Sequence, residues 1–215
     1  MAIQLDALRG RLDARLSRAA KLFAGASGRV KGRCDHADVV FLDGLLSYAW
    51  QAWCKFCRDL VIHSCLGAQT KAGAVLPVTA SPATVQRISH LAIRGNKSHA
   101  AIPLATNAVW RFEPTWGDVA ALVRIIPVAN PANAAQLLTT FGGVTTGPAH
   151  LQKVRNACHH LNDQSFADVR SLQLYYLSSP IRFPAEASFW VDTVTGDFAF
   201  VAWLDEMRLL AANAV

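Results

Sequence analysis

The stretch DVVFLDGLLSYAWQAWCKFCRDLVIHSCL, residues 38–66, decides the fold that this sequence favours. Its apolar residues recur so densely that they cover more than half of the circumference of a helix, which is typical of a buried helix. Asp35 or Asp38 can cap its start, and Gly67 is the first following residue that suits a helix stop. A helix of this length spans roughly 45 Å. We therefore predict a long central helix around which other helices must pack.

The segments on either side carry helical periodicity and helix punctuation. Apolar residues recur every three or four positions, and Pro or a capping residue opens most of these segments. Thr195-Gly196 suits a hairpin turn. We predict an all-α fold, a helical bundle around the long second helix, with irregular insertions around 95–115 and 180–197. The predicted helices besides the central one are 3–24, 81–93, 115–126, 130–142, 146–162, 165–177 and 198–213.

Length and composition indicate one globular domain over residues 1–215. The chain is 52% hydrophobic and only 17% charged, and its mean hydropathy is +0.22. These values exclude a disordered or acidic solvating chain. A chain of this length can bury one substantial core.

The positive charge of the chain is concentrated near its start. The net charge is +6, and residues 1–35 alone hold eight Lys or Arg against three acids, a net of +5. A basic segment of this kind either contacts nucleic acid or forms a solvated helix face with a basic loop. Both interpretations stay open at this point.

Cysteine use and hydropathy indicate a cytoplasmic protein without a membrane span. Five cysteines lie within apolar runs, and no signal-peptide pattern opens the chain. No run of about 18 apolar residues occurs, so we expect no membrane helix. The pair Cys54 and Cys57 has C-x-x-C spacing but no second pair, so we interpret it as core packing rather than as a zinc or redox site. We expect no metal and no cofactor.

One later helix carries a cluster of polar residues suited to chemistry. Arg155, Asn156, His159 and His160 lie within six residues. A guanidinium can hold a phosphate by two parallel hydrogen bonds, and an imidazole can move protons near neutral pH. Together they suit phosphodiester chemistry. The apolar residues expected to anchor this polar face are Leu151, Val154, Ala157 and Leu161.

The inserted asparagine makes this cluster specific. In a shuffled chain of this composition, an Arg with a His five residues later is expected about 0.5 times, and three such pairs occur here. Requiring Asn after the Arg lowers the expectation to about 0.016, and only Arg155 meets that condition. The rival Arg58-Asp59 with His63 lies among aromatic residues, so we interpret His63 as structural.

The segment RNACHH, residues 155–160, resembles the Arg-Asn-x-x-x-His signature of the HEPN superfamily. In that family an all-α bundle carries the motif on an inner helix, and the long helix around WQAWCKFCR, residues 50–58, resembles the central helix of bacterial members. The resemblance implies a ribonuclease that needs no metal. It also implies a 2′,3′-cyclic phosphate product and a site formed across a dimer interface.

The resemblance also implies a role for each motif residue. His160 would be the general base or acid at the ribose 2′-hydroxyl, and Arg155 would steady the charge that develops on the phosphoryl oxygens. Asn156 would orient the histidine or the phosphate. His159 departs from the small residue that usually precedes the motif histidine, so three roles stay open for it. It can bind phosphate, replace His160 as the proton carrier, or point to solvent.

Further basic residues are candidates for contact with RNA. Lys153 belongs to the motif helix, and Arg94, Lys97 and His99 lie in or beside a polar basic loop. A helix C-terminus whose basic residues complement the helix dipole is an equally open interpretation of that loop.

We therefore expect a dimeric endoribonuclease with RNA as its substrate. A role as a toxin or antiphage effector would add an antitoxin or another defence-system partner protein. The alternative is a non-catalytic HEPN-like helical module that dimerises or binds a partner protein or nucleic acid.

Overall fold

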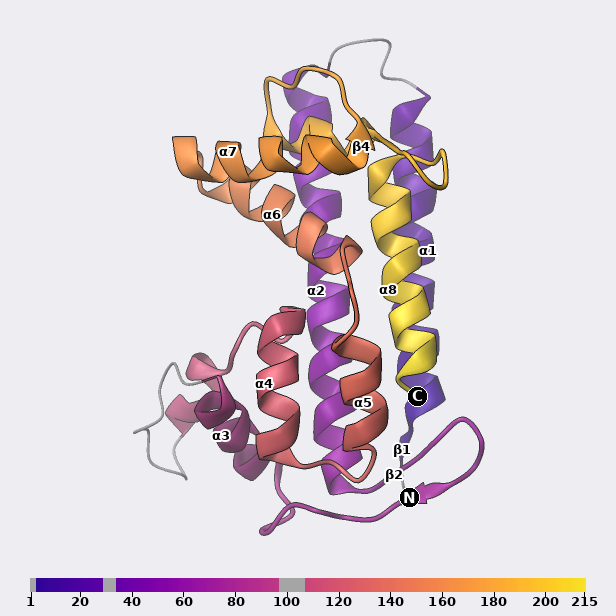
Figure 1. Cartoon of the computed structure of the whole chain (residues 1–215), viewed down its shortest axis with the longest axis vertical. Helices are drawn as coiled ribbons and strands as arrows, with labels where there is room; N and C mark the ends of the chain where they lie inside the picture. The colour runs from indigo at the N-terminus through magenta and orange to yellow at the C-terminus, as the bar shows by residue number, and fades with distance from the viewer. Residues whose placement is uncertain (1–2, 29–33, 97–106) are drawn as a thin grey trace. The chain divides into compact units, whose positions relative to one another are not determined.

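The computed structural model describes residues 3–28, 34–96 and 107–215, and they are mostly helical, as predicted (Figure 1). The chain divides into two compact units. The first unit comprises residues 1–12, 53–145 and 209–215, and the second comprises residues 13–52 and 146–208. The division falls within three helices, α1 (Leu5–Ser27), α2 (His36–Leu66) and α8 (Ala199–Asn213). The prediction of a single domain over 1–215 stays a prediction.

The long second helix lies where the sequence predicts it. Asp35 and Asp38 cap its start reciprocally, because each side chain accepts a hydrogen bond from the backbone N–H of the other. Gly67 ends it with a φ of +93°, a conformation that favours glycine. The helix buries most of its apolar residues in the two units, among them Leu46, Trp53, Phe56 and Leu60.

In the first unit, the second half of α2 packs against α4 (Val119–Ala129) and α5 (Ala134–Phe141). Trp53 donates to the carbonyl of Gly117 over 3.0 Å, and its ring lies 6.3 Å from that of Phe141. The helix α3 (Val85–Gly95) packs against α4 and against the 3-10 helix η1 (Asn107–Phe112). A small sheet joins β1 (Ile3–Gln4), parallel, and β3 (Val75–Leu76), antiparallel, to the central β2 (Ala68–Gln69).

In the second unit, α6 (Gly147–His159) packs against α7 (Asp163–Arg170) and against the 3-10 helix η3 (Pro184–Phe189). The 3-10 helix η2 (Ser171–Tyr175) leads into β4 (Tyr176–Leu177), which pairs with β5 (Val191–Asp192). Phe23 of α1 stacks on Phe189 and tilts against Phe200 of α8, so these elements share one aromatic core.

Several predicted helix boundaries are wrong, and each has a local cause. Thr84 caps α3 in place of Ser81, and Asp118 caps α4 in place of Thr115. Pro127 lies inside the last turn of α4, where the sequence predicts a helix that ends before it. The helix ends instead at Ala129 and is capped by Asn130, whose φ of 50° places it in the left-handed region.

One further predicted helix has the wrong bounds, and one predicted turn is correct. The helix predicted over 165–177 is α7, which begins at Asp163 and ends at Arg170, and the chain then forms η2 and β4. The turn at Thr195-Gly196 is confirmed, since Gly196 has a φ of 76° and Asp192 accepts from the N–H groups of Val194 and Thr195.

Among the described residues, no helix is both long and apolar enough to cross a membrane.

Candidate functional site

The helix α6, which carries the predicted motif, is held at its start by a carboxylate from α8. Glu206 accepts hydrogen bonds from the Thr146 N–H over 2.8 Å, the Thr146 hydroxyl over 2.9 Å and the Gly147 N–H over 2.7 Å. These bonds satisfy backbone donors that a helix start leaves without partners, and a negative charge there complements the helix dipole. The sequence predicts the start at Thr146 or Gly147 correctly. It gives no sign that the cap comes from a residue about 60 positions later.

Substitution of Gly147 by alanine is expected to destabilise the protein by about 1–3 kcal/mol. A Cβ atom at this position would lie 3.0 Å from the Glu206 Cβ and 3.1 Å from the Trp203 Cα, so α8 would have to shift. Gly44 is the matched control, since a Cβ there meets nothing within 4 Å, and alanine should stabilise α2 by about 0.5–1 kcal/mol. Urea unfolding measures both changes. Equal effects of the two substitutions would contradict this packing.

The buried face of α6 agrees with the prediction at three of its four anchors. Leu151, Val154 and Ala157 are completely buried. Leu161 is not an anchor, because 73% of it is exposed. The cause is the end of the helix, which is at His159 rather than near Asn162. Asn162 instead caps α7 in a reciprocal capping box with Ser165.

Arg155 and Asn156 lie half-buried on α6 and contact each other. Nη1 of Arg155 donates to Oδ1 of Asn156 over 3.1 Å. Nε of Arg155 is buried and has no hydrogen-bond partner among the described residues. Within the same part of the chain, Arg155 forms no ion pair. Among the described residues, no carboxylate neutralises the charge of the Arg155 guanidinium, which can therefore bind an anion.

His159 is tied to two polar residues of α2. Its Nε2 lies 3.0 Å from Oγ of Ser47 and 3.5 Å from Oδ1 of Asp43. Asp43 and Ser47 are four residues apart and therefore share one face of α2. We did not single out either residue from the sequence. Their only signal is the i, i+4 spacing of two polar residues in a strongly apolar helix.

This cluster is not a serine-hydrolase triad. In such a triad, the serine and the carboxylate contact opposite nitrogens of the imidazole ring, so that one nitrogen exchanges the proton while the other is held. Here Ser47 and Asp43 both lie at Nε2 of His159. The arrangement holds one ring nitrogen and leaves the other for a different partner.

His160 lies beyond the last turn of α6 and is exposed. Its backbone N–H still donates to the Asn156 carbonyl over 2.8 Å, and its own carbonyl accepts from the Ser165 hydroxyl. Among the described residues, no hydrogen bond reaches its ring. The two histidines therefore differ, because the ring of His159 is held by α2, whereas the ring of His160 has no hydrogen-bond partner in the described part of the chain.

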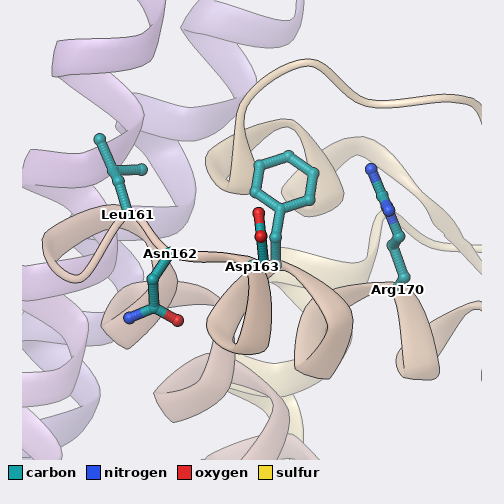
Figure 2. A pocket seen from close by; sticks show the side chains of 5 residues that line it. Leu161, Asn162, Asp163 and Arg170 are labelled. Carbon is teal, nitrogen blue, oxygen red and sulfur yellow. The ribbon is translucent and has the colours of Figure 1, made fainter.

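A surface pocket of about 420 Å³ follows His160 directly (Figure 2). Its lining includes Phe166, and the guanidinium of Arg170 lies 5.0 Å from the centre of that ring. Figure 2 shows the side chains of Asp163 and Arg170 on one side of the ribbon, whereas Asn162 points the other way. The residues that line the pocket are Leu161, Asn162, Asp163, Phe166 and Arg170.

The structure divides the residues predicted to contact RNA. Lys153 is exposed on α6, in the same unit as Arg155 and His159. Arg94 is exposed in the last turn of α3, which belongs to the first unit. Lys97 and His99 lie outside the described residues. The described residues therefore bring Lys153 into the unit of the motif and leave Arg94 in the other.

Arg58, the arginine of the rival pair Arg58 and His63, forms an ion pair within the protein. Arg58 donates to both oxygens of Glu113 over 2.6 and 2.7 Å, and Ser89 and Trp116 donate to the same carboxylate. Burial alone would raise the pKa of Glu113, but these hydrogen bonds hold it below its usual value. Burial lowers the pKa of His63. Arg58 is thus committed to a protein carboxylate and is not available to a phosphate.

The cysteines lie in the core or close to it. All five are free, and burial raises the pKa of the Cys158 thiol to about 12 and that of Cys57 well above its usual range. A thiol with so high a pKa is a poor nucleophile and a poor metal ligand at neutral pH. Within residues 3–28, 34–96 and 107–215, no group of three or more His, Cys, Asp or Glu is arranged to hold a metal ion.

A buried histidine that we did not single out from the sequence lies on α6. Nδ1 of His150 is 2.7 Å from the hydroxyl of Tyr176, which also accepts from Nε1 of Trp203 over 2.7 Å. Because the indole can only donate, the phenol proton is free to bond His150. Burial, helped by the charge of Lys153, lowers the pKa of His150 to about 4. This imidazole is therefore neutral near pH 7 and ties α6 to β4 and α8.

Acidification is expected to weaken the protein through His150. Its pKa is about 4 when folded and near 6.5 when unfolded, so the unfolded state binds the proton first as the pH falls. Stability from this group is complete above about pH 6.5 and is lost towards pH 4, by about 1–3 kcal/mol. Urea unfolding between about pH 7 and pH 4.5 measures the loss. His150→Gln should remove that part of the pH dependence; an unchanged profile in the variant would contradict this account.

Comparisons with known proteins return no relatives. No protein-family model matches the chain, and neither the curated proteins nor the solved structures contain a significant match.

Proposed function

We propose that this protein is a metal-independent endoribonuclease of HEPN type. The observation that carries the proposal is the α6 segment from Arg155 to His160. It places a guanidinium without a carboxylate partner among the described residues beside an amide and two imidazoles that are at least partly accessible. These groups are the ones that a phosphodiester transfer without a metal requires. The resemblance to the Arg-Asn-x-x-x-His signature points to the same reaction.

In the proposed reaction, the ribose 2′-hydroxyl attacks the adjacent phosphorus. A histidine removes the 2′-hydroxyl proton, the bond from O2′ to phosphorus forms, and the bond from phosphorus to O5′ breaks. Arg155 stabilises the charge on the phosphoryl oxygens, and Asn156 orients the guanidinium that it contacts. The products are a 2′,3′-cyclic phosphate and a 5′-hydroxyl. The family pattern selects His160 as the proton carrier.

The surroundings of the motif support single-stranded RNA as the substrate. Aromatic rings and guanidinium planes stack on unpaired bases, and both Phe166 and Arg170 line the pocket that begins at Leu161. Lys153 adds an exposed positive charge on the same helix. Arg94 in the first unit is proposed to contact the RNA backbone, as Lys97 and His99 are. The excess of basic residues in the whole chain favours an anionic partner.

A test of this function must not depend on which histidine acts. The purified full-length protein is incubated with total RNA in EDTA, and the wild type is compared with a variant that carries His159→Ala and His160→Ala together. Gln152→Ala on the same helix is the control. We expect cleavage by the wild type and the control and none by the double variant. Equal cleavage by all three proteins, or none by the wild type, would refute the proposal.

The alternative is a non-catalytic helical module of the same type. Exposed apolar side chains in the second unit favour it, because Leu174, Leu177 and Val194 are 89%, 68% and 90% exposed. Where exposed apolar residues form a contiguous patch, they mark sites at which proteins bind one another. A stable complex with a partner protein, combined with growth that is indifferent to induction of the wild type, would support this alternative. A toxic wild type and a harmless double histidine variant would support the nuclease, acting as a toxin or antiphage effector, and a homodimer remains part of both proposals.

A further inference from the structure

The structure holds one of the two motif histidines much more firmly than the other, and it is not the one that the family pattern selects. Nε2 of His159 lies within 3.0 Å of Ser47 Oγ and 3.5 Å of Asp43 Oδ1. The ring of His160 has no hydrogen bond among the described residues. A proton carrier works efficiently when a further group fixes its orientation and tautomer. This requirement distinguishes the two residues.

The partners of His159 determine which ring nitrogen carries the hydrogen. Oδ1 of Asp43 is buried, forms no hydrogen bond in the described chain, and lies 3.5 Å from Nε2 of His159. A carboxylate can only accept, so the nearby Nε2 of His159 is the donor that matches it. With the hydrogen on Nε2, the lone pair lies on Nδ1, which no described residue contacts by a hydrogen bond. About 38% of the His159 side chain is exposed, so the ring is accessible from outside.

His159 also shares a helix face with the arginine. Residues four apart on a helix lie on one face, so His159 and Arg155 share a face of α6, whereas His160 is about 140° around the axis from Arg155. The helix ends at His159, which removes His160 from the regular face altogether. Asp43 and Arg155 lie on α2 and α6, the two helices that the contact between Ser47 and His159 joins. No ion pair joins Asp43 to Arg155 among the described residues.

We propose that His159 exchanges the proton with the ribose 2′-hydroxyl, and that Asp43 and Ser47 are positioning residues that hold its ring through Nε2. Nδ1 takes the 2′-hydroxyl proton while the bond from O2′ to phosphorus forms and the bond from phosphorus to O5′ breaks. The O5′ leaving group takes a proton from water, and the imidazolium returns its proton to solvent. This assignment rests on the proposed nuclease function and replaces His160 as the proton carrier.

The tautomer can be tested without any reference to activity. The full-length protein is labelled with 15N-histidine, and two-bond nitrogen–proton correlations are recorded near neutral pH. We expect His159 to carry its hydrogen on Nε2. Asp43→Asn should mix the two tautomers, because an amide can donate as well as accept. A wild-type His159 with its hydrogen on Nδ1 would overturn the assignment even if the protein cleaves RNA.

Single substitutions test the proton transfer. His159→Gln keeps an N–H donor for Asp43 and Ser47 and therefore keeps the fold, but it cannot carry a proton. We expect it to lower kcat about 10²–10⁴-fold without a change in binding to a 2′-deoxy RNA analogue. Imidazole in the buffer should restore part of the activity of His159→Ala, which a purely structural role would not allow. Asp43→Asn and Ser47→Ala should lower kcat but not affinity.

The outcomes separate this inference from the function on which it rests. His160→Ala should lose far less activity than His159→Gln. If His160→Ala is inactive and His159→Gln is active, the inference is wrong and the nuclease function stands. If both single variants and the double variant cleave like the wild type, or if the wild type does not cleave, the proposed function and the inference both fail.

Discussion

Substitution of Arg155 by alanine is expected to reduce RNA cleavage about 10²–10³-fold. The guanidinium lies beside Asn156, and its buried Nε has no hydrogen-bond partner among the described residues. In the proposed reaction, Arg155 stabilises the charge that develops on the phosphoryl oxygens. Removing a donor that acts on charge in the transition state lowers kcat rather than affinity. Single-turnover cleavage, together with binding of a 2′-deoxy analogue, measures the two quantities separately.

Two controls make the Arg155 result specific. Arg155→Lys keeps the charge but loses the planar pair of donors, so it should keep only part of the activity. Gln152→Ala removes a half-buried polar side chain from α6 itself and should leave cleavage unchanged. Cleavage by Arg155→Ala at the wild-type rate, in a protein that unfolds like the wild type, would remove Arg155 from the site.

Substitution of Glu113 by alanine is expected to destabilise the protein by about 3–5 kcal/mol. The carboxylate accepts two hydrogen bonds from Arg58 and one each from Ser89 and Trp116. Only 11% of the Glu113 side chain and 24% of the Arg58 side chain are exposed. Its removal would therefore leave a largely buried charge and two further donors without an acceptor.

An exposed ion pair on α2, the helix that carries Arg58, is the matched control for this buried pair. Lys55 lies 2.7 Å from Asp59, but 63% of its side chain is exposed. Water already solvates this ammonium, so Lys55→Ala should cost less than about 0.5 kcal/mol. Urea unfolding of both variants compares the pairs. A Glu113→Ala variant as stable as Lys55→Ala would show that the Arg58 network does not hold the first unit together.

The features that the sequence predicts correctly depend on neighbours in the chain. The extent of α2 follows from its dense apolar residues and from Asp35 and Gly67 at its ends. Likewise, α6 starts where Thr146 and Gly147 predict it, and α8 matches its apolar stripe. These signals act within a few residues, so a sequence pattern can reveal them.

The features that the sequence does not reveal depend on partners far along the chain. Ser47 and His159 are 112 positions apart, and their contact exists only because α6 packs on α2. Glu206, which caps α6, also lies far along the chain from the residue that it contacts, since it is 60 positions after Thr146. Leu161 looks like a further apolar anchor but is exposed, because α6 ends two residues before it. The choice between His159 and His160 therefore could not be made from spacing alone.

The products of RNA cleavage show whether the ribose 2′-hydroxyl attacks the phosphorus. A short oligoribonucleotide that the protein cleaves in EDTA is compared with an analogue that has a single 2′-deoxy sugar on the 5′ side of the cut. We expect a 2′,3′-cyclic phosphate and a 5′-hydroxyl from the first, and no cut at that position in the second. Cleavage of the deoxy analogue there, or products with a 5′-phosphate, would contradict attack by the 2′-hydroxyl and with it the role given to α6.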